Sequence, residues 1–369
     1  MIIPKANGGI EPLIDVPVTD HPVDAAATVA VPLRRDDGGE RGGGRPARNQ
    51  PRRDKRDVHG WVVLDKPIGM TSTQAVAVVK RLFQAKRAGH AGTLDPLASG
   101  SLPIALGEAT KTVPFVMDGR KRYRFTVCWG EERDTDDTEG RVTLSSPIRP
   151  SAAAIGALLP QFTGCIEQIP PQYSAIKIQG ERAYDLARDG ETVDLKPRAV
   201  EIHHLALVEQ IDDSHSIFEA ECGKGTYVRA LARDIGRLLG CYGQSCALRR
   251  TLAGPFGEVE MILLEQLEAL CHRAASGEGS LADALLPVET ALDDIPALAV
   301  TRADAARLHR GQAVLLRGRD APHCSGIVYV TVAGRLLALA EIGNGELIPK
   351  RVFNLTGLTA SSARSQESM

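Results

Sequence analysis

The sequence predicts a mixed α and β protein with a small, mainly β domain near its C-terminus. Strand-like segments follow one another with helical patterns between only some of them, and the segment after residue 294 consists mostly of short apolar runs separated by turn residues. The chain has 369 residues, of which 43% are apolar, so it can form roughly two to three domains and at least one substantial core.

The first 57 residues form an extension that we expect to be disordered. Segment 34–56 holds nine Lys/Arg against four Asp/Glu and shows no apolar periodicity, so it cannot bury enough apolar surface to offset its chain entropy. Such a run is usually a solvated tail, although an auxiliary RNA-binding arm remains an alternative. The formal charge of the whole chain is −2, which argues against a uniformly basic nucleic-acid binder and leaves a local basic surface open.

Ordered structure is expected from Gly60. Residues 61–64 are typical of a short buried strand, which must end before Pro67 because proline cannot continue a central ladder. Thr71 and Gln74 have capping-box spacing, which predicts the start of a helix.

Further elements follow in the middle of the chain. Residues 123–129 alternate as a strand whose apolar side chains share one face. The other predicted elements are a helix over 151–159, an extended segment over 170–177, two strands within 199–222 around the polar turn 212–214, and an amphipathic helix over 228–239 that ends at Gly240.

The C-terminal region is predicted to form a separate β unit. Asn344 and Gly345 form an Asn-Gly pair, a strong hairpin signal between apolar runs. The expected domains are a disordered extension (1–57), a main domain (58–294), a small β domain (295–356) and a flexible tail (357–369).

The composition also predicts the cellular location of the chain, the state of its cysteines and whether it binds a metal. No window approaches the roughly 20 apolar residues of a membrane-spanning helix, and the N-terminus lacks a signal-peptide pattern, so we expect a cytoplasmic protein. The cysteines are scattered without a C-x-x-C pair and are expected to be reduced and mostly buried. The nine histidines show no metal-ligand spacing, so no metal site is expected.

Three motifs could carry chemistry. Asp95 lies in a glycine-rich loop, where it is either a turn former or helix cap before Pro96 or a carboxylate that acts as nucleophile or acid/base. Segment 223–229 is either an anion-binding loop or a plain helix N-terminus with surface cations, and its spacing is not that of a Walker A loop. Segment 121–124 places Tyr123 among cations, which suits base stacking beside phosphates but is also common on solvated strands.

In order along the chain, these motifs resemble the TruB family of tRNA pseudouridine synthases, which isomerise uridine 55 in the T-loop. The resemblance covers about 60–254, with a weaker likeness to a PUA-type RNA-binding domain near the C-terminus. It implies a pseudouridine synthase-type α+β fold, with a mainly antiparallel sheet and flanking helices. The matching motifs are Leu64-Asp65-Lys66-Pro67-x-Gly69-x-Thr71-Ser72, Arg87-Ala88-Gly89-His90-x-Gly92-x-Leu94-Asp95-Pro96-x-Ala98-x-Gly100, Leu106-Gly107-Glu108-Ala109-Thr110-Lys111, Lys121-x-Tyr123, Asp134-Thr135-Asp136, Pro170-Pro171-x-Tyr173-Ser174-Ala175-x-Lys177, Gly225-Thr226-Tyr227-x-Arg229 and Leu248-Arg249-Arg250.

The resemblance assigns catalytic roles to three residues. Asp95 matches the nucleophile, and whether it attacks the sugar or the uracil ring stays open. Tyr123 matches the tyrosine that stacks on the base and is implicated in removing the proton from the ring carbon. Arg229 matches the arginine that pairs with the nucleophile and favours its ionised form.

Other residues match binding positions of the family. Tyr227 and Leu248 match residues that line the uracil pocket, and His90 matches a residue at the RNA interface. Lys66 is expected to support the catalytic loop beside the substrate rather than to react. Segment 170–177 resembles the RNA-clamping insertion of the family and is expected to be mobile without RNA.

The resemblance therefore implies an isomerase that acts on the T-arm of tRNA as a monomer, without metal, cofactor or obligate protein partner. The alternative is an RNA-binding or tRNA-folding protein whose catalysis is secondary or lost. A carboxylate in the site favours the enzyme, because binding a polyanion gives no reason to place one there.

Overall fold

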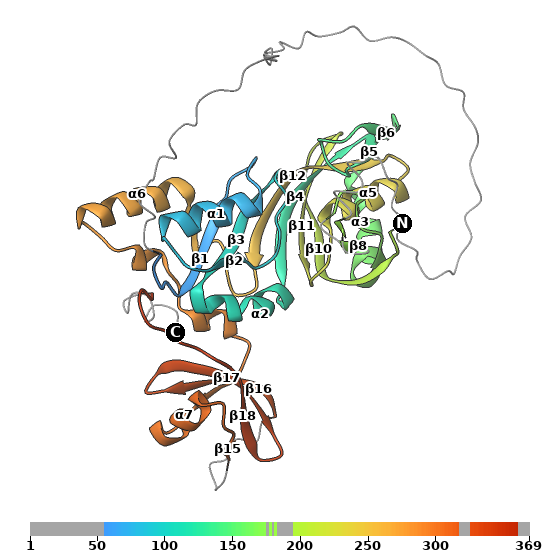
Figure 1. Cartoon of the computed structure of the whole chain (residues 1–369). Helices are drawn as coiled ribbons and strands as arrows, with labels where there is room; N and C mark the ends of the chain where they lie inside the picture. The colour runs from blue at the N-terminus through green and yellow to red at the C-terminus, as the bar shows by residue number, and fades with distance from the viewer. Residues whose placement is uncertain (1–54, 175–176, 179–180, 183–194, 317–324, 361–369) are drawn as a thin grey trace, which may run out of the picture. The chain divides into compact units, whose positions relative to one another are not determined.

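The computed structural model describes residues 55–174, 177–178, 181–182, 195–316 and 325–360, which all belong to one compact unit of the chain (Figure 1). Most of the N-terminal extension and most of the predicted flexible tail therefore lie outside the described residues. Part of the segment that resembles the RNA-clamping insertion also lies outside them. No helix within the described ranges is long and apolar enough to cross a membrane.

A nine-stranded sheet forms the centre of the main domain (Figure 1). Neighbouring strands are antiparallel except at two places, where β1 pairs with β13 and β3 pairs with β12 in parallel. The prediction of a mainly antiparallel sheet is thus confirmed. In the order β13-β1-β3-β12-β4-β11-β10-β7, with β2 paired to β3, the strands are β1 (Gly60–Lys66), β2 (Ala88–His90), β3 (Ala98–Leu106), β4 (Lys121–Trp129), β7 (Gly164–Gln168), β10 (Arg198–Asp212), β11 (His215–Cys222), β12 (Gly243–Ala253) and β13 (Met261–Leu263).

Helices flank this sheet, as predicted. The first of them begins where the capping box indicated: the Thr71 hydroxyl accepts a hydrogen bond from the Gln74 amide, and the Gln74 side chain accepts one from the Thr71 amide. Within the part of the main domain that the structure describes, the α-helices are α1 (Ser72–Leu82), α2 (Val113–Asp118), α3 (Ala152–Leu158), α5 (Val228–Leu238) and α6 (Leu264–Ser276), and the 3₁₀ helices are η1 (Gly107–Lys111), η2 (Leu159–Phe162), η3 (Leu281–Ala284) and η4 (Val288–Leu292).

Two apolar clusters lie along the sheet and share side chains. One gathers the inward residues of β4, β10 and β11 with α3 and α5, and the other gathers those of β1 and β3 with α1 and α6. Tyr123 and Leu248 pack against both clusters, so these two side chains stand where the clusters meet.

A second sheet of five strands forms near the C-terminus and has its own apolar core with one helix. Asn344 and Gly345 take the left-handed conformation at φ 53° and 74°, which suits a tight hairpin between two strands, as their sequence predicts. Its elements are β14 (Ala297–Ala299), α7 (Arg302–His309), β15 (Val314–Leu315), β16 (Gly326–Val332), β17 (Arg335–Gly343) and β18 (Glu346–Val352), and the remaining short strands of the chain are β5 (Glu131–Arg133), β6 (Val142–Ser145), β8 (Lys177–Ile178) and β9 (Glu181–Arg182).

The predicted flexible tail is fixed at its beginning. The Leu358 amide donates to the Asp57 carbonyl at 2.9 Å, and the His59 amide donates to the Leu358 carbonyl at 2.8 Å. These bonds join Leu358, near the start of the predicted flexible tail, to the backbone of Asp57 and His59.

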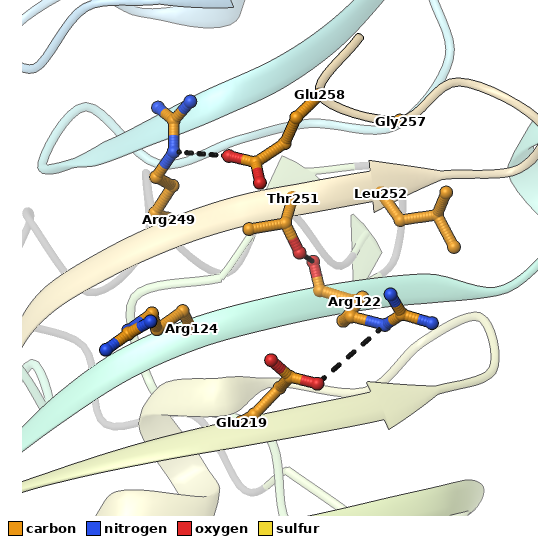
Figure 2. A pocket seen from close by; sticks show the side chains of 8 residues that line it. All are labelled: Arg122, Arg124, Glu219, Arg249, Thr251, Leu252, Gly257 and Glu258. Atoms are coloured by element: carbon orange, nitrogen blue, oxygen red, sulfur yellow. Dashed lines mark hydrogen bonds and ion pairs between the residues drawn. The ribbon is translucent and has the colours of Figure 1, made fainter. Parts of the chain in front are cut away.

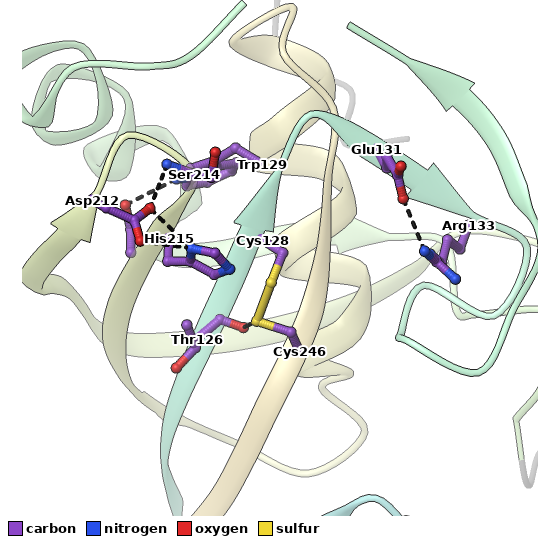
Figure 3. The surroundings of a disulfide bond; sticks show 10 residues. Thr126, Cys128, Trp129, Glu131, Arg133, Asp212, Ser214, His215 and Cys246 are labelled. Carbon is purple, nitrogen blue, oxygen red and sulfur yellow. Dashed lines mark hydrogen bonds and ion pairs between the residues drawn. A yellow bond between two sulfur atoms is a disulfide. The ribbon is translucent and has the colours of Figure 1, made fainter. Parts of the chain in front are cut away.

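The expectation that all cysteines are reduced and mostly buried is also wrong. Cys128 and Cys246 form a disulfide, with their Cα atoms 5.9 Å apart (Figure 3). They lie on the neighbouring strands β4 and β12, a proximity that no sequence spacing reveals. Among the free cysteines Cys165 is exposed, Cys271 is half-buried, and Cys222 and Cys241 are buried.

Candidate active site

The loop between β2 and β3 carries Asp95. The backbone of Leu94 is anchored on both sides by the Ser72 hydroxyl, which donates to its carbonyl and accepts from its amide, both at 2.9 Å. The Asp95 carbonyl accepts from the Ala98 amide at the start of β3, so Asp95 begins a turn and no helix follows Pro96. The side chain of Asp95 is 37% exposed to solvent. The loop therefore presents a carboxylate that is held in place and still reachable.

Arg250 on β12 holds the same loop from the other side. Its buried guanidinium donates to the carbonyls of Ser101 at 2.7 Å, Gly92 at 3.2 Å and Thr93 at 3.4 Å. Gly100 is required beside it, since a Cβ at that position would lie 2.2 Å from the Arg250 carbonyl oxygen. The sequence placed Arg250 in a motif but gave it no role; the structure shows its buried guanidinium bonded to the loop that carries Asp95.

Lys66 supports the loop from β1. Its fully buried ammonium donates to the carbonyls of Pro67 and Met70, both at 2.8 Å, and of Pro96 at 3.4 Å. Burial lowers the pKa of Lys66 from 10.5 to about 8; the Asp95 carboxylate opposes this shift, and the Arg250 guanidinium adds to it. The contacts agree with the expected supporting role.

Arg229, in the first turn of α5, is brought to Asp95 as the motif implied. Its Nε lies 2.9 Å from the Asp95 carboxylate, while its Nη1 lies 3.2 Å from Asp137 and donates to the Thr135 carbonyl at 2.8 Å. Nη2 donates to the Tyr173 carbonyl at 3.0 Å. Thr135, Asp137 and Tyr173 thus hold the two terminal nitrogens of the guanidinium, and its Nε is directed toward Asp95.

A second buried arginine fixes the loop that carries Asp137. Arg233 pairs with Asp136 and with Asp234, in each case at 2.8 Å, and donates to the Ile169 carbonyl. Burial raises the pKa of Asp136 to about 6, and the Arg233 guanidinium opposes this shift. The turn that carries the Asp134-Thr135-Asp136 motif and Asp137 therefore supports Arg229.

Three residues expected to contact the base or the RNA lie around these groups. Tyr123 points inward from β4, and burial raises the pKa of its phenol, while Arg250 lowers it. Tyr227 caps α5, and its amide and carbonyl are both bonded to the Gln168 side chain, at 2.8 and 3.1 Å. His90 ends β2, where the loop that carries Asp95 begins.

A narrow pocket of about 20 Å³ opens beside Asp95, large enough for about one water molecule. It is lined by Asp95, Leu97, Ala98, Asp137, Arg229, Ser245, Cys246, Ala247 and Leu248. A pyrimidine ring does not fit this space, so base binding requires side chains or the loop to move.

The cations around Tyr123 do not surround its ring. Arg122 and Arg124 alternate with Tyr123 along β4 and line a pocket of about 430 Å³ on the opposite face of the sheet, together with Arg249, Glu219 and neighbouring residues (Figure 2). Arg122 and Arg124 therefore lie on the face of the strand opposite Tyr123, because successive side chains of a strand face opposite sides, and a contact of these arginines with phosphates stays a prediction.

The glycine loop before α5 also distributes its charges differently from an anion site. Lys224 pairs with Asp118 at 2.8 Å on the surface, and Arg229 turns to Asp95. The carboxylates of Asp118 and Asp95 thus occupy the positions next to these two cations that a bound anion would take.

Comparison with known proteins agrees with this geometry. Residues 80–228 match the model of the TruB family pseudouridylate synthase N-terminal domain, and residues 229–293 match that of the tRNA pseudouridylate synthase B C-terminal domain. The chain is 81% identical over 348 residues to the tRNA pseudouridine synthase B of Rhodopseudomonas palustris, covering 94% of each chain. It is 85% identical over 316 residues to that of Nitrobacter winogradskyi, covering 86% of this chain and 88% of the relative.

Solved structures share the fold. A chain of the structure described as a Cbf5-Nop10-Gar1 complex aligns with a TM-score of 0.63 at 24% identity, covering 84% of this chain and 91% of that one. The resemblance drawn from the sequence motifs is confirmed: the chain belongs to the TruB family of pseudouridylate synthases and is an isomerase.

Proposed function

We propose that this enzyme converts uridine 55 in the T-loop of tRNA to pseudouridine, with Asp95 as the nucleophile. The observation that carries the proposal is the Asp95 carboxylate, 2.9 Å from a buried arginine and partly open to solvent at the mouth of a pocket. The names of the relatives, tRNA pseudouridine synthase B, support tRNA as the substrate. A tRNA substrate in turn supports the expected cytoplasmic location.

The reaction detaches uracil from the ribose, turns it and rejoins it through a ring carbon. Asp95 attacks an electron-poor centre of the sugar or the ring, and Arg229 orients the carboxylate during both bond changes. Tyr123 stacks on the base and, as the phenolate, accepts the proton from the carbon that forms the new bond; burial opposes this ionisation and the Arg250 guanidinium favours it. Leu248 and Tyr227 line the uracil pocket.

Access to the site requires the uridine to leave its stack. Extrusion of a base costs a few kcal/mol, which contacts to the T-loop must offset. We assign His90 to this interface because it begins the loop that carries Asp95. The narrow pocket supports an opening step on binding, and Tyr173, whose carbonyl accepts a hydrogen bond from Arg229, takes part in it.

We also propose a division of the chain into two domains with separate roles. Residues 58–294 form the catalytic domain and residues 295–356 an RNA-binding domain of the PUA type, which the five-stranded sheet supports. The enzyme acts as a monomer on the T-arm without a metal or organic cofactor, because its own carboxylate, phenol and guanidinium supply the required groups.

The test is tritium release from tRNA labelled at carbon 5 of uracil. Asp95→Asn is expected to fold and bind tRNA but to release no tritium, because the amide is not a nucleophile. Asp213→Asn makes the same chemical change at an exposed turn and is expected to act like the wild type. Undiminished release by Asp95→Asn would refute the nucleophile, and release from a position other than 55 in mapped tRNA would refute the site.

A further inference from the structure

Three side chains that can bind metals meet on the neighbouring strands β11, β4 and β12 (Figure 3). His215 on β11 pairs directly with Cys128 on β4. Cys246 lies where β12 is irregular, between Ser245 and Ala247. One donor atom from each of the three side chains lies within 4.8 Å of the others. Three adjacent, hydrogen-bonded strands thus hold two sulfur atoms and an imidazole in a fixed arrangement.

The imidazole is already oriented for a ligand. The His215 Nδ1 lies 2.9 and 3.0 Å from the two carboxylate oxygens of Asp212, so the Nδ1 proton is engaged there. The other ring nitrogen, Nε2, faces the two sulfur atoms (Figure 3). A histidine that binds a metal characteristically donates its second ring N–H to a carboxylate in this way, because the carboxylate fixes the tautomer and makes the ligand more basic.

We propose that Cys128, Cys246 and His215 form a binding site for a thiophilic divalent cation of the Zn²⁺ type when the disulfide is reduced. An added phosphine reduces the disulfide to two thiols and is itself oxidised to the phosphine oxide, while one water molecule supplies the oxygen of the oxide and the two thiol protons. Binding of the cation then releases one proton from each thiol, since the thiolate is the ligand. Two thiolates and an imidazole are preferred zinc ligands, and the fourth position is left to water.

The disulfide and the metal use the same two sulfur atoms, so each state excludes the other. Cys246 also lines the pocket that contains Asp95, and Leu248 follows it on the same strand. Occupation of the site therefore fixes β12 at the wall of that pocket. The proposal concerns binding alone and does not depend on the reaction assigned to Asp95.

Titration of the full-length protein with Co²⁺, a spectroscopic substitute for Zn²⁺, tests the site. The protein is reduced with a phosphine, freed of reductant without oxygen and compared with the same protein left oxidised. The reduced form is expected to bind about one equivalent, with thiolate-to-cobalt charge-transfer bands and the d–d bands of tetrahedral cobalt. The oxidised form is expected to show neither set of bands. Equal binding by the two forms would overturn the proposal without any mutation.

Variants then identify the ligands. Cys246→Ser and His215→Ala are expected to abolish the tetrahedral spectrum, and Asp212→Asn to weaken binding about 10-fold through the loss of the carboxylate partner. Cys165→Ser, which removes an exposed free cysteine elsewhere, is the matched control and should bind as the wild type does. A wild-type spectrum from His215→Ala would refute the three-ligand site, as would loss of the spectrum in Cys165→Ser.

Discussion

The two sides of the central sheet hold arginines in opposite settings. On the side of Asp95, the side chains of Arg229 and Arg233 are 8% and 7% exposed, and each is bonded to carboxylates and to backbone carbonyls. On the open side, Arg122 and Arg249 are 44% and 35% exposed; Arg122 pairs with Glu221, and Arg249 with Asp65 and Glu258. Breaking a buried pair leaves a charge without compensation, whereas a surface pair contributes little. The buried arginines Arg229 and Arg233 therefore maintain the geometry of the site, and the loss of either is expected to lower the stability of the folded chain.

The largest difference between the two sides is expected from neighbours on β4. Tyr123→Phe removes only the inward phenol oxygen and should lower the rate of pseudouridine formation about 10²- to 10⁴-fold, the usual contribution of a general base. Arg124→Gln removes an outward cation and should change that rate less than about twofold. Single-turnover tritium release measures both, and equal effects would show that the side of the strand does not decide the role.

The free energy of unfolding should also depend more on the buried arginines than on the exposed ones. Arg233→Met leaves the buried carboxylates of Asp136 and Asp234 without their cation and should lower the free energy of unfolding by about 3–5 kcal/mol. Arg122→Met makes the same change on the open side and should cost at most about 1 kcal/mol. Urea denaturation followed by circular dichroism measures the difference, which would vanish if solvent screened both arginines equally.

The buried lysine should make stability depend on pH. The pKa of Lys66 is about 8 in the folded chain and 10.5 when solvated, so the unfolded chain binds the extra proton between these values. The contribution of Lys66 to the free energy of unfolding is therefore most favourable above pH 10.5, where the side chain is neutral in both states. It falls as the pH falls from 10.5 and is lost once the pH has fallen through 8. Relative to Lys66→Met, the wild type should gain about 2 kcal/mol between pH 7.5 and 9.5. The surface variant Lys350→Met should parallel the wild type in urea denaturation; a similar divergence there would assign the effect to another group.

The smallest effect is expected from the N-terminal cations. Deletion of residues 1–53 should leave the turnover rate unchanged and weaken tRNA binding a few-fold at low salt, because solvated charges add only unspecific attraction to phosphates. Binding of the two forms should converge as salt is raised. Loss of turnover in the shortened chain would show that the extension belongs to the active enzyme.

Local patterns predicted most of the fold. The alternation over 123–129, the capping box at Thr71 and the Asn-Gly turn at residue 344 each depend on residues a few positions apart, and the structure has all three. The ion pair of Asp95 with Arg229 came from the family motifs rather than from the residue pattern.

The features that the sequence did not predict depend on distant residues. Arg250 bonds to Thr93 over a separation of 157 residues, and the cysteines of the disulfide are 118 residues apart. The face on which Arg122 and Arg124 lie was not predicted for a related reason, because the strand pattern does not say which face meets the site. Such contacts follow from the order of strands in the sheet, which spacing along the chain does not encode.

The parallel pairing of β3 with β12 has a consequence for how the enzyme matures. The loop that carries Asp95 is made early in synthesis, yet the residue that bonds to its carbonyls, Arg250, emerges from the ribosome much later. Closing so long a stretch of chain is entropically slow and comes before the contacts that reward it. In a nascent chain the loop that carries Asp95 therefore lacks the contacts with Arg250, and these contacts form only when the sheet is complete.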